Sequence, residues 1–428
     1  AFLMDIKIKY MKKIIFVSLI LGSFLWEGCD DNSFDYQMYQ PGLNDIDSVY
    51  FSTGAPMMIA DGQATLDFIV EAYRKVKMDN EEGVRVDSMV PVDIKTLPAG
   101  SVKIFKGTEE VGEKWSTTDA TPGTVTFIAK VGERASSPKT VVLRPKPALP
   151  PLKYVDVVFH VFELKKSDPS YNPLTYQEMD YELLEQALQN MNDVFNNKVG
   201  RGPNGASANI VFRLASKNGN GMELQKPGYN RIDYDENNIK PSSWGFDVSS
   251  FIAYINENAN RIWDPEKYLN IVVIPSGANM SMGTKTPQWQ VVADGEEPIA
   301  GIPNVVDDYT IPTRDYANTC IGVPQTLFRP GSGKKIELYP FVGSFYGILG
   351  TNRKVGNTDY CTDTQLYDGS GIWSELKKVS WNGDKFLANN AMDDNRYPSL
   401  RNNFTLDQIT RMRQVMEKCP GRNNGLDQ

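Results

Sequence analysis

Histidine is almost absent from this chain, which has one, His160, among its 428 residues. A peptidase-type zinc site takes two or three imidazoles as ligands, and a serine or cysteine nucleophile usually takes one as its base. One imidazole cannot fill such a zinc site. His160 lies within the apolar stretch YVDVVFHVFE, where a buried, hydrogen-bonded core residue is the expected role. The sequence therefore disfavours the commonest hydrolytic chemistries.

Cysteine is also scarce, with four in the chain. Cys29 stands near the N-terminus, and the other three are Cys320, Cys361 and Cys419. Their wide spacing matches no zinc finger or ribbon. Two of the three could form a disulfide in an exported protein, but the sequence does not choose the pair. The formal net charge is −8, without the excess of basic residues that is typical of nucleic-acid-binding proteins, so we expect no nucleic-acid partner.

The N-terminal segment predicts export. Lys12 and Lys13 precede an apolar run that is too short to span a bilayer comfortably, and Gly28 and Cys29 follow it. We expect upstream residues and a signal peptide over 1–28. Gly28-Cys29 resembles a bacterial lipobox, which implies that Cys29 is lipidated; the alternative is a plain secretory signal with an incidental cysteine.

The two acidic residues that follow Cys29 resemble signals that send lipoproteins of the Bacteroides group to the cell surface. The expectation is thus an outer-membrane lipoprotein at the cell surface, attached to the membrane through its N-terminal lipid. Residues 29–48 are polar and rich in turn formers, and we interpret them as the lipidated tether.

Residues 49–144 predict an all-β module. Short apolar-polar alternations, such as that over 65–72, are separated by turn residues, as in a sandwich of immunoglobulin-like size. We interpret this module as a spacer. Residues 145–152 contain four prolines and predict a stiff linker.

Residues 153–428 predict a mixed α/β domain. YVDVVFHVFE has apolar residues on both faces, as a central strand does. A helix follows from Tyr176, with Thr175 as its N-cap, and ANIVFRLA and YLNIVVIPSG predict two further strands. Thr405 and Gln408 form the pattern of a capping box at the start of the last helix.

The stretch PFVGSFYGILGTN, which begins at Pro340, has the outline of a zinc-peptidase helix with its glycine turn, but it contains no histidine and no glutamate. It is either a catalytic motif that has lost its catalytic residues or an ordinary buried helix. Around it, NTDYCTDTQ and NNAMDDNRYPSLRNNFTLDQITRMRQV resemble segments of the pappalysin group of metzincin zinc peptidases, in particular lipoproteins of Bacteroides-like bacteria. Together with the predicted strands, the resemblance covers about residues 153–424 and implies a metzincin-like fold.

The metzincin helix reads H-E-x-x-H-x-x-G-x-x-H, with three zinc ligands and a glutamate base. With its glycine placed on Gly347, the ligand positions are Pro340, Ser344 and Gly350, and the base position is Phe341. The retained positions are Gly347, Thr351 and the methionine turn Met392-Asp393, whereas Asp394 stands where a tyrosine is usual. The resemblance also implies a calcium site that could use Asp363 and Thr364; the alternative is that these residues cap turns.

These changes imply a non-catalytic domain that binds no zinc and needs no cofactor. Metzincins bind extended peptides along an edge strand, and such backbone pairing requires no metal. The resulting hypothesis is a surface pseudopeptidase that binds a protein or peptide. Two alternatives stay open: an active zinc-dependent metallopeptidase, and a purely structural or adhesive surface protein.

Overall fold

The computed structural model describes residues 39–163, 166–167, 171, 179–200, 202–233, 248–274, 286–306, 309–329, 334–369, 375–394 and 400–424. The chain divides into two compact units, Ala1–Gly42 and Leu43–Gln428, and all the elements below belong to the second. The predicted signal peptide and Cys29 lie outside the described residues. Within the part of the chain that is described, no helix is long and apolar enough to cross a membrane.

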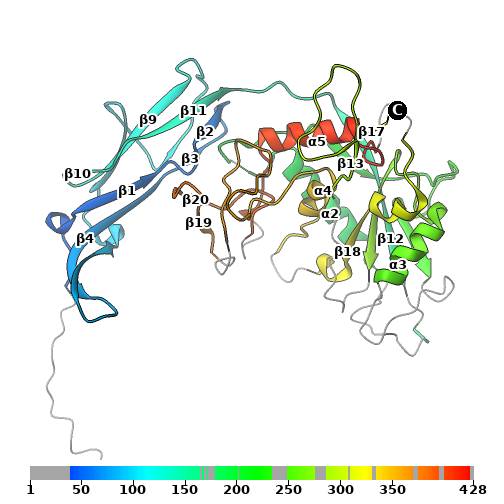
Figure 1. The fold of residues 1–428 in the computed structure, drawn as a ribbon, viewed down its shortest axis with the longest axis horizontal. Helices are drawn as coiled ribbons and strands as arrows, with labels where there is room; N and C mark the ends of the chain where they lie inside the picture. Colours follow the sequence, from blue (N-terminus) through cyan, green and yellow to red (C-terminus); the bar gives the residue numbers. More distant parts are fainter. Residues whose placement is uncertain are drawn as a thin grey trace, which may run out of the picture. The chain divides into compact units, whose positions relative to one another are not determined.

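The first part of the second unit, which we call the β body (Leu43–Pro145), contains two main sheets (Figure 1). The antiparallel sheet β1-β4-β5 is formed by Ser48–Ser52, Ile69–Asp79 and Arg85–Val92. The larger sheet has the order β2-β11-β9-β6-β7, formed by Met57–Ala60, Lys139–Pro145, Thr124–Val131, Val102–Lys106 and Glu109–Val111, with β10 (Arg134–Ala135) beside β9. Strands β3 (Leu66–Asp67) and β8 (Lys114–Trp115) pair separately. The short 3₁₀ helices are η1 (Leu43–Asp45) and η2 (Ile94–Thr96).

Aromatic side chains join these sheets in one core. The ring of Phe68 lies 5.6 Å from that of Phe51 and 5.0 Å from that of Phe127, which in turn contacts Trp115. The alternation predicted over 65–72 is interrupted at Phe68, and both Leu66 and Ile69 are buried. The reason is a change of partner, because the chain pairs with β8 before Phe68 and with β1 after it.

The second part, which we call the α/β body (Lys153–Asn424), is built on a parallel sheet. Its order is β13-β12-β15-β18, formed by Ile210–Leu214, Lys153–Glu163, Tyr268–Ile274 and Cys320–Pro324. Strand β14 (Tyr229–Asp233) pairs with the second half of β12. The prediction of a central strand is confirmed, since β12 has partners on both sides and is buried over most of its length.

Among the described residues of this body, four α-helices accompany the sheet: α2 (Tyr181–Phe195), α3 (Val248–Glu257), α4 (Tyr339–Phe345) and α5 (Leu406–Lys418). The remaining short elements are η3 (Ala259–Arg261), η4 (Thr313–Thr319), η5 (Gln325–Phe328) and the strand pairs β16–β17 (Gln290–Val291, Asn304–Val305) and β19–β20 (Lys377–Val379, Lys385–Leu387). The capping box of Thr405 and Gln408 is confirmed. Helix α2 begins at Tyr181, where the Asp180 carboxylate accepts from the Glu182 amide. Thr175, the predicted cap, lies outside the described residues.

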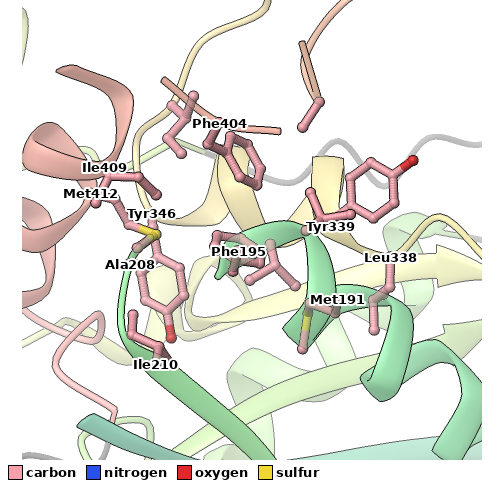
Figure 2. Close-up of a cluster of buried hydrophobic side chains, with 14 of the residues drawn as sticks. Met191, Phe195, Ala208, Ile210, Leu338, Tyr339, Tyr346, Phe404, Ile409 and Met412 are labelled. Carbon is pink, nitrogen blue, oxygen red and sulfur yellow. The ribbon is translucent and has the colours of Figure 1, made fainter. Parts of the chain in front are cut away.

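Helix α4 is anchored in the core of the α/β body (Figure 2). Phe195 of α2 stacks against Phe404 with ring centroids 4.6 Å apart, and Tyr339 and Tyr346 at the two ends of α4 are buried in the same cluster. Met412 of α5 completes this packing. Buried neighbours on several sides therefore fix the position of α4.

Candidate functional site

Helix α4 has a buried face and a half-exposed face. Tyr339, Val342, Gly343 and Phe345 are buried, whereas Pro340, Phe341 and Ser344 are half-buried. Residues four apart lie on the same side of a helix, so Pro340 and Ser344 share the more exposed side. The two proposed ligand positions within α4 are thus brought together, but neither proline nor serine offers zinc the imidazole nitrogen that it prefers.

The glycine turn follows directly. Gly347 has φ +80°, in the left-handed region that favours glycine. A Cβ added there would lie 2.8 Å from Val415 Cγ2 of α5, so the close approach of α5 also requires glycine. Its amide donates to the Ser344 carbonyl at 3.0 Å, as expected just beyond a helix end. Gly347 therefore ends α4 and lets the chain turn against α5.

Two arginines hold carbonyls at the end of α4 and in the turn that follows it. Arg411 Nε donates to the Gly347 carbonyl at 2.8 Å. Arg422, which is buried, donates to the Phe345 carbonyl at 2.7 Å, and its guanidinium lies 3.8 Å from the centre of the Phe345 ring. A cation at a helix C-terminus is favoured by the helix dipole. These contacts fix the end of α4 to the last helix and its following turn.

The methionine turn lies against this assembly. Met392 Sδ would be 3.2 Å from a Cβ added at Gly343, so it packs closely on α4. The Thr351 hydroxyl donates to Asp393 Oδ1 at 2.5 Å, and the Asn390 amide donates to Asp393 Oδ2 at 2.9 Å. The structure thus brings Thr351 to Met392-Asp393, just beyond the turn at Gly347. Asp394 is exposed beside them.

Asp393 should make stability depend on pH. Burial raises the pKa of its carboxyl to about 7, against hydrogen bonds from Thr351 and Asn390 that lower it. The folded state therefore holds a proton that the unfolded state releases near pH 4, so the free energy of unfolding should fall as pH rises from about 4 to about 7. Asp393→Asn should make this decline shallower, which urea unfolding at about pH 4.5 and pH 7.5 would measure. An unchanged slope in the variant would contradict the assignment.

Asp363 is paired with a cation from the β body. Its Oδ2 accepts from Arg144 Nη1 at 2.9 Å and from the Asp407 amide at 3.0 Å, while Arg144 Nη2 donates to Asp407 Oδ1 at 2.9 Å. Burial raises the pKa of Asp363 to about 6, and Arg144 opposes that rise. Thr364 does not join this group, because its hydroxyl donates to Asp359 Oδ2 at 2.8 Å.

The expected calcium ion does not fit these residues. Calcium takes six to eight oxygen ligands, whereas the buried, unpartnered oxygens here are Asp363 Oδ1 and Asn204 Oδ1, which line a cavity of about 50 Å³. Thr364 is already bonded, and Arg144 supplies positive charge. Over the described ranges, no three His, Cys, Asp or Glu side chains are grouped as metal ligands.

His160 is a core residue, as predicted. It is fully buried, and its Nδ1 and Nε2 each lie 2.8 Å from an amide, of Asn230 and Asn270 respectively. Because the Asn230 contact is made by its amide nitrogen, Nδ1 accepts and Nε2 donates to Asn270 Oδ1. Burial lowers the pKa of His160 to about 4, so the ring is neutral at physiological pH and has no free lone pair for a metal.

The three described cysteines are free thiols. Cys320 and Cys419 are buried, which raises the pKa of each to about 12, and burial also raises the pKa of the half-buried Cys361. Thiolate, not thiol, is the reactive form. None of these cysteines is therefore an activated nucleophile.

The span from just before α4 to the end of α5 corresponds to a known peptidase family. Residues 337–417 match the family model described as pregnancy-associated plasma protein-A. This segment is similar to the pappalysin peptidases. It contains α4, Gly347, Thr351, the methionine turn and most of α5, which are the features that the geometry above brings together.

Solved structures of mirolysin from Tannerella forsythia are also similar. Mature mirolysin in complex with a cleaved peptide is 19% identical, with 62% of this chain and 92% of that chain covered and a TM-score of 0.40. A promirolysin mutant is 18% identical over 63% of this chain and 81% of that chain, also with a TM-score of 0.40. No curated protein matches this chain.

Several residues that organise the site were not predicted. Arg411 lies within the quoted helix segment FTLDQITRMRQV, so the resemblance could have drawn attention to it. Arg422 and Arg144 stand in stretches without a recognisable pattern, and only the folded chain brings them to the end of α4 and to Asp363.

Proposed function

We propose that this chain is an exported, lipid-anchored surface protein whose peptidase-like domain binds a protein or peptide without cleaving it. The observation that carries this proposal is the half-exposed face of α4, which presents Pro340, Phe341 and Ser344. If the glycine of the metzincin motif is placed on Gly347, these three residues stand at the positions of two zinc ligands and the base. In a zinc peptidase the metal lowers the pKa of bound water to about 7, and a carboxylate takes its proton. Phenylalanine cannot act as that base.

The rest of the chain supports the same proposal. The one histidine of the chain, His160, has both ring nitrogens engaged, so it cannot replace the missing ligands. The β body would be an immunoglobulin-like module, and Cys29 would carry the lipid that attaches the protein to the outer membrane at the cell surface. No nucleic-acid partner is expected.

The peptide site is best placed at α4. Strand β18 ends the described part of the sheet, and its Cys320, Ile321, Gly322 and Val323 are buried, so this strand offers no open edge to a peptide. The half-exposed face of α4, with Pro340 and Phe341, instead offers apolar contact area. We therefore expect an apolar side chain of the ligand to contact this face.

Metal content is the first test. The purified protein should contain zinc well below one equivalent after dialysis and should show no peptidase activity that a chelator removes, because three ligand positions lack imidazole. Elemental analysis and a fluorogenic peptide library, with and without chelator, measure both. Stoichiometric zinc or chelator-sensitive cleavage would restore the active-peptidase alternative.

Binding separates the proposal from the purely structural or adhesive alternative. A peptide array probed with the purified protein should give sequence-dependent binding, and Phe341→Asp should weaken it by placing a charge on the exposed side of α4. Ser137→Asp, a substitution on the β body, is the matched control. Binding that is absent, or that both variants weaken equally, would favour a structural role.

A further inference from the structure

The β body and the α/β body share a polar junction. The Ser52 hydroxyl donates to the Lys385 carbonyl at 2.6 Å, and the Lys385 amide donates to the Tyr50 hydroxyl at 2.7 Å. The Lys385 ammonium also pairs with Glu71 of β4. The hairpin β19–β20, which carries Lys385, therefore binds the sheet β1-β4-β5 through hydrogen bonds of its backbone and an ion pair of its side chain.

A second set of contacts lies at and just before β2, which follows β1 in the chain. The Gln365 amide donates to the Gly54 carbonyl at 2.8 Å, the Asn204 amide donates to the Met57 carbonyl at 2.9 Å, and the Ile59 amide donates to the Pro203 carbonyl at 2.8 Å. Backbone groups of the β body thus depend on the α/β body for their hydrogen bonds. A freely moving spacer would not make such contacts.

Arg144, in the last strand of the β body, adds ion pairs to this junction. Its guanidinium bridges Asp363, whose side chain is 0% exposed, and Asp407, whose side chain is 23% exposed. Without this cation, two carboxylates from separate segments would face each other in a largely buried site, and breaking a buried ion pair by removing one partner is strongly destabilising.

We propose that the guanidinium of Arg144 neutralises the neighbouring carboxylates of Asp363 and Asp407 in place of a metal ion. By joining these residues it makes the β body and the α/β body one cooperative folding unit. The two parallel N–H donors of arginine suit two acceptors at fixed positions better than a lysine ammonium does. This inference is independent of what the peptidase-like domain binds.

Calorimetric unfolding of the full chain tests the proposal. The wild type should melt in one transition, and neither EDTA nor about 1 mM calcium should move its melting temperature. Arg144→Met should lower the melting temperature by about 3–6 °C or split the transition in two, because it leaves two carboxylates unpaired. The control Arg85→Met, at an exposed position of β5, should shift it by less than about 1 °C.

Two outcomes would overturn the proposal: a wild-type melting temperature that falls with EDTA or rises with calcium, or an Arg144→Met protein that melts like the wild type. If Arg144→Met does not fold, Arg144→Lys should still fold and show a smaller loss, since it keeps the charge but not both donors. The double variant Arg144→Met/Asp407→Asn should lose less than the sum of its single variants. Strict additivity would show that the guanidinium and Asp407 are not coupled.

Discussion

The combined substitution Pro340→His, Ser344→His and Gly350→His is expected to raise bound zinc from well below one equivalent to about one. Positions 340 and 344 share the half-exposed side of α4. A Cβ added at Gly350 meets only the Met392 carbonyl, at an ordinary 3.9 Å, so a side chain fits there. Two imidazoles on α4 and a third beyond the glycine turn would supply three of the four ligands that zinc prefers in a tetrahedral site, with water as the fourth.

Elemental analysis after dialysis measures the result, and the triple substitution of the same three residues by alanine is the matched control. Peptide cleavage is not expected from the ligands alone, because Phe341 still cannot accept a proton. A folded triple-histidine protein without zinc would show that the three positions do not converge, and would overturn the placement of the metzincin motif on Gly347.

Gly347→Val is expected to lower the free energy of unfolding by about 2–4 kcal/mol, for two separate reasons. A β-branched residue is strained at φ +80°, and its Cβ would approach Val415 Cγ2 to 2.8 Å. Because Gly347 ends α4, the strain acts on the candidate site itself. Urea unfolding at neutral pH measures the loss.

Gly350→Ala is the control for this experiment. It introduces a Cβ at an ordinary contact distance, so a change of less than about 1 kcal/mol is expected. If Gly347→Val were as stable as the wild type, the turn would not need a left-handed residue, and the main structural reason for the glycine would be lost.

Local patterns were sufficient to predict several of the regular elements. The stretch over 154–163, with apolar residues on both faces, is the central strand β12, and the pattern at Thr405 and Gln408 is a real capping box. These features depend on residues close together in the sequence. The role of the single histidine was also predictable, because burial in a strand with apolar residues on both faces disfavours the charged ring and favours a hydrogen-bonded, neutral one.

Features that depend on distant partners could not be predicted in this way. The alternation is interrupted at Phe68 because the chain pairs with β8 before this residue and with β1 after it. The pattern of apolar and polar side chains does not reveal such a change of partner strand. Arg144 is separated from Asp363 by 219 residues and from Asp407 by 263. Asp363, the possible calcium ligand, is paired with this arginine, and the sequence near Asp363 gives no sign of it.

The pairing of β2 with β11 sets an order on folding. These parallel strands are the early Met57–Ala60 and the late Lys139–Pro145, so the larger sheet cannot close until nearly the whole β body has been synthesised. N-terminal parts of a chain emerge first, and contacts between distant residues form slowly. We therefore expect Arg144, in the strand between β2 and β9, to stay hydrated until α5, near the end of the chain, brings Asp407 to it. Docking of this last helix is then the step that completes the molecule.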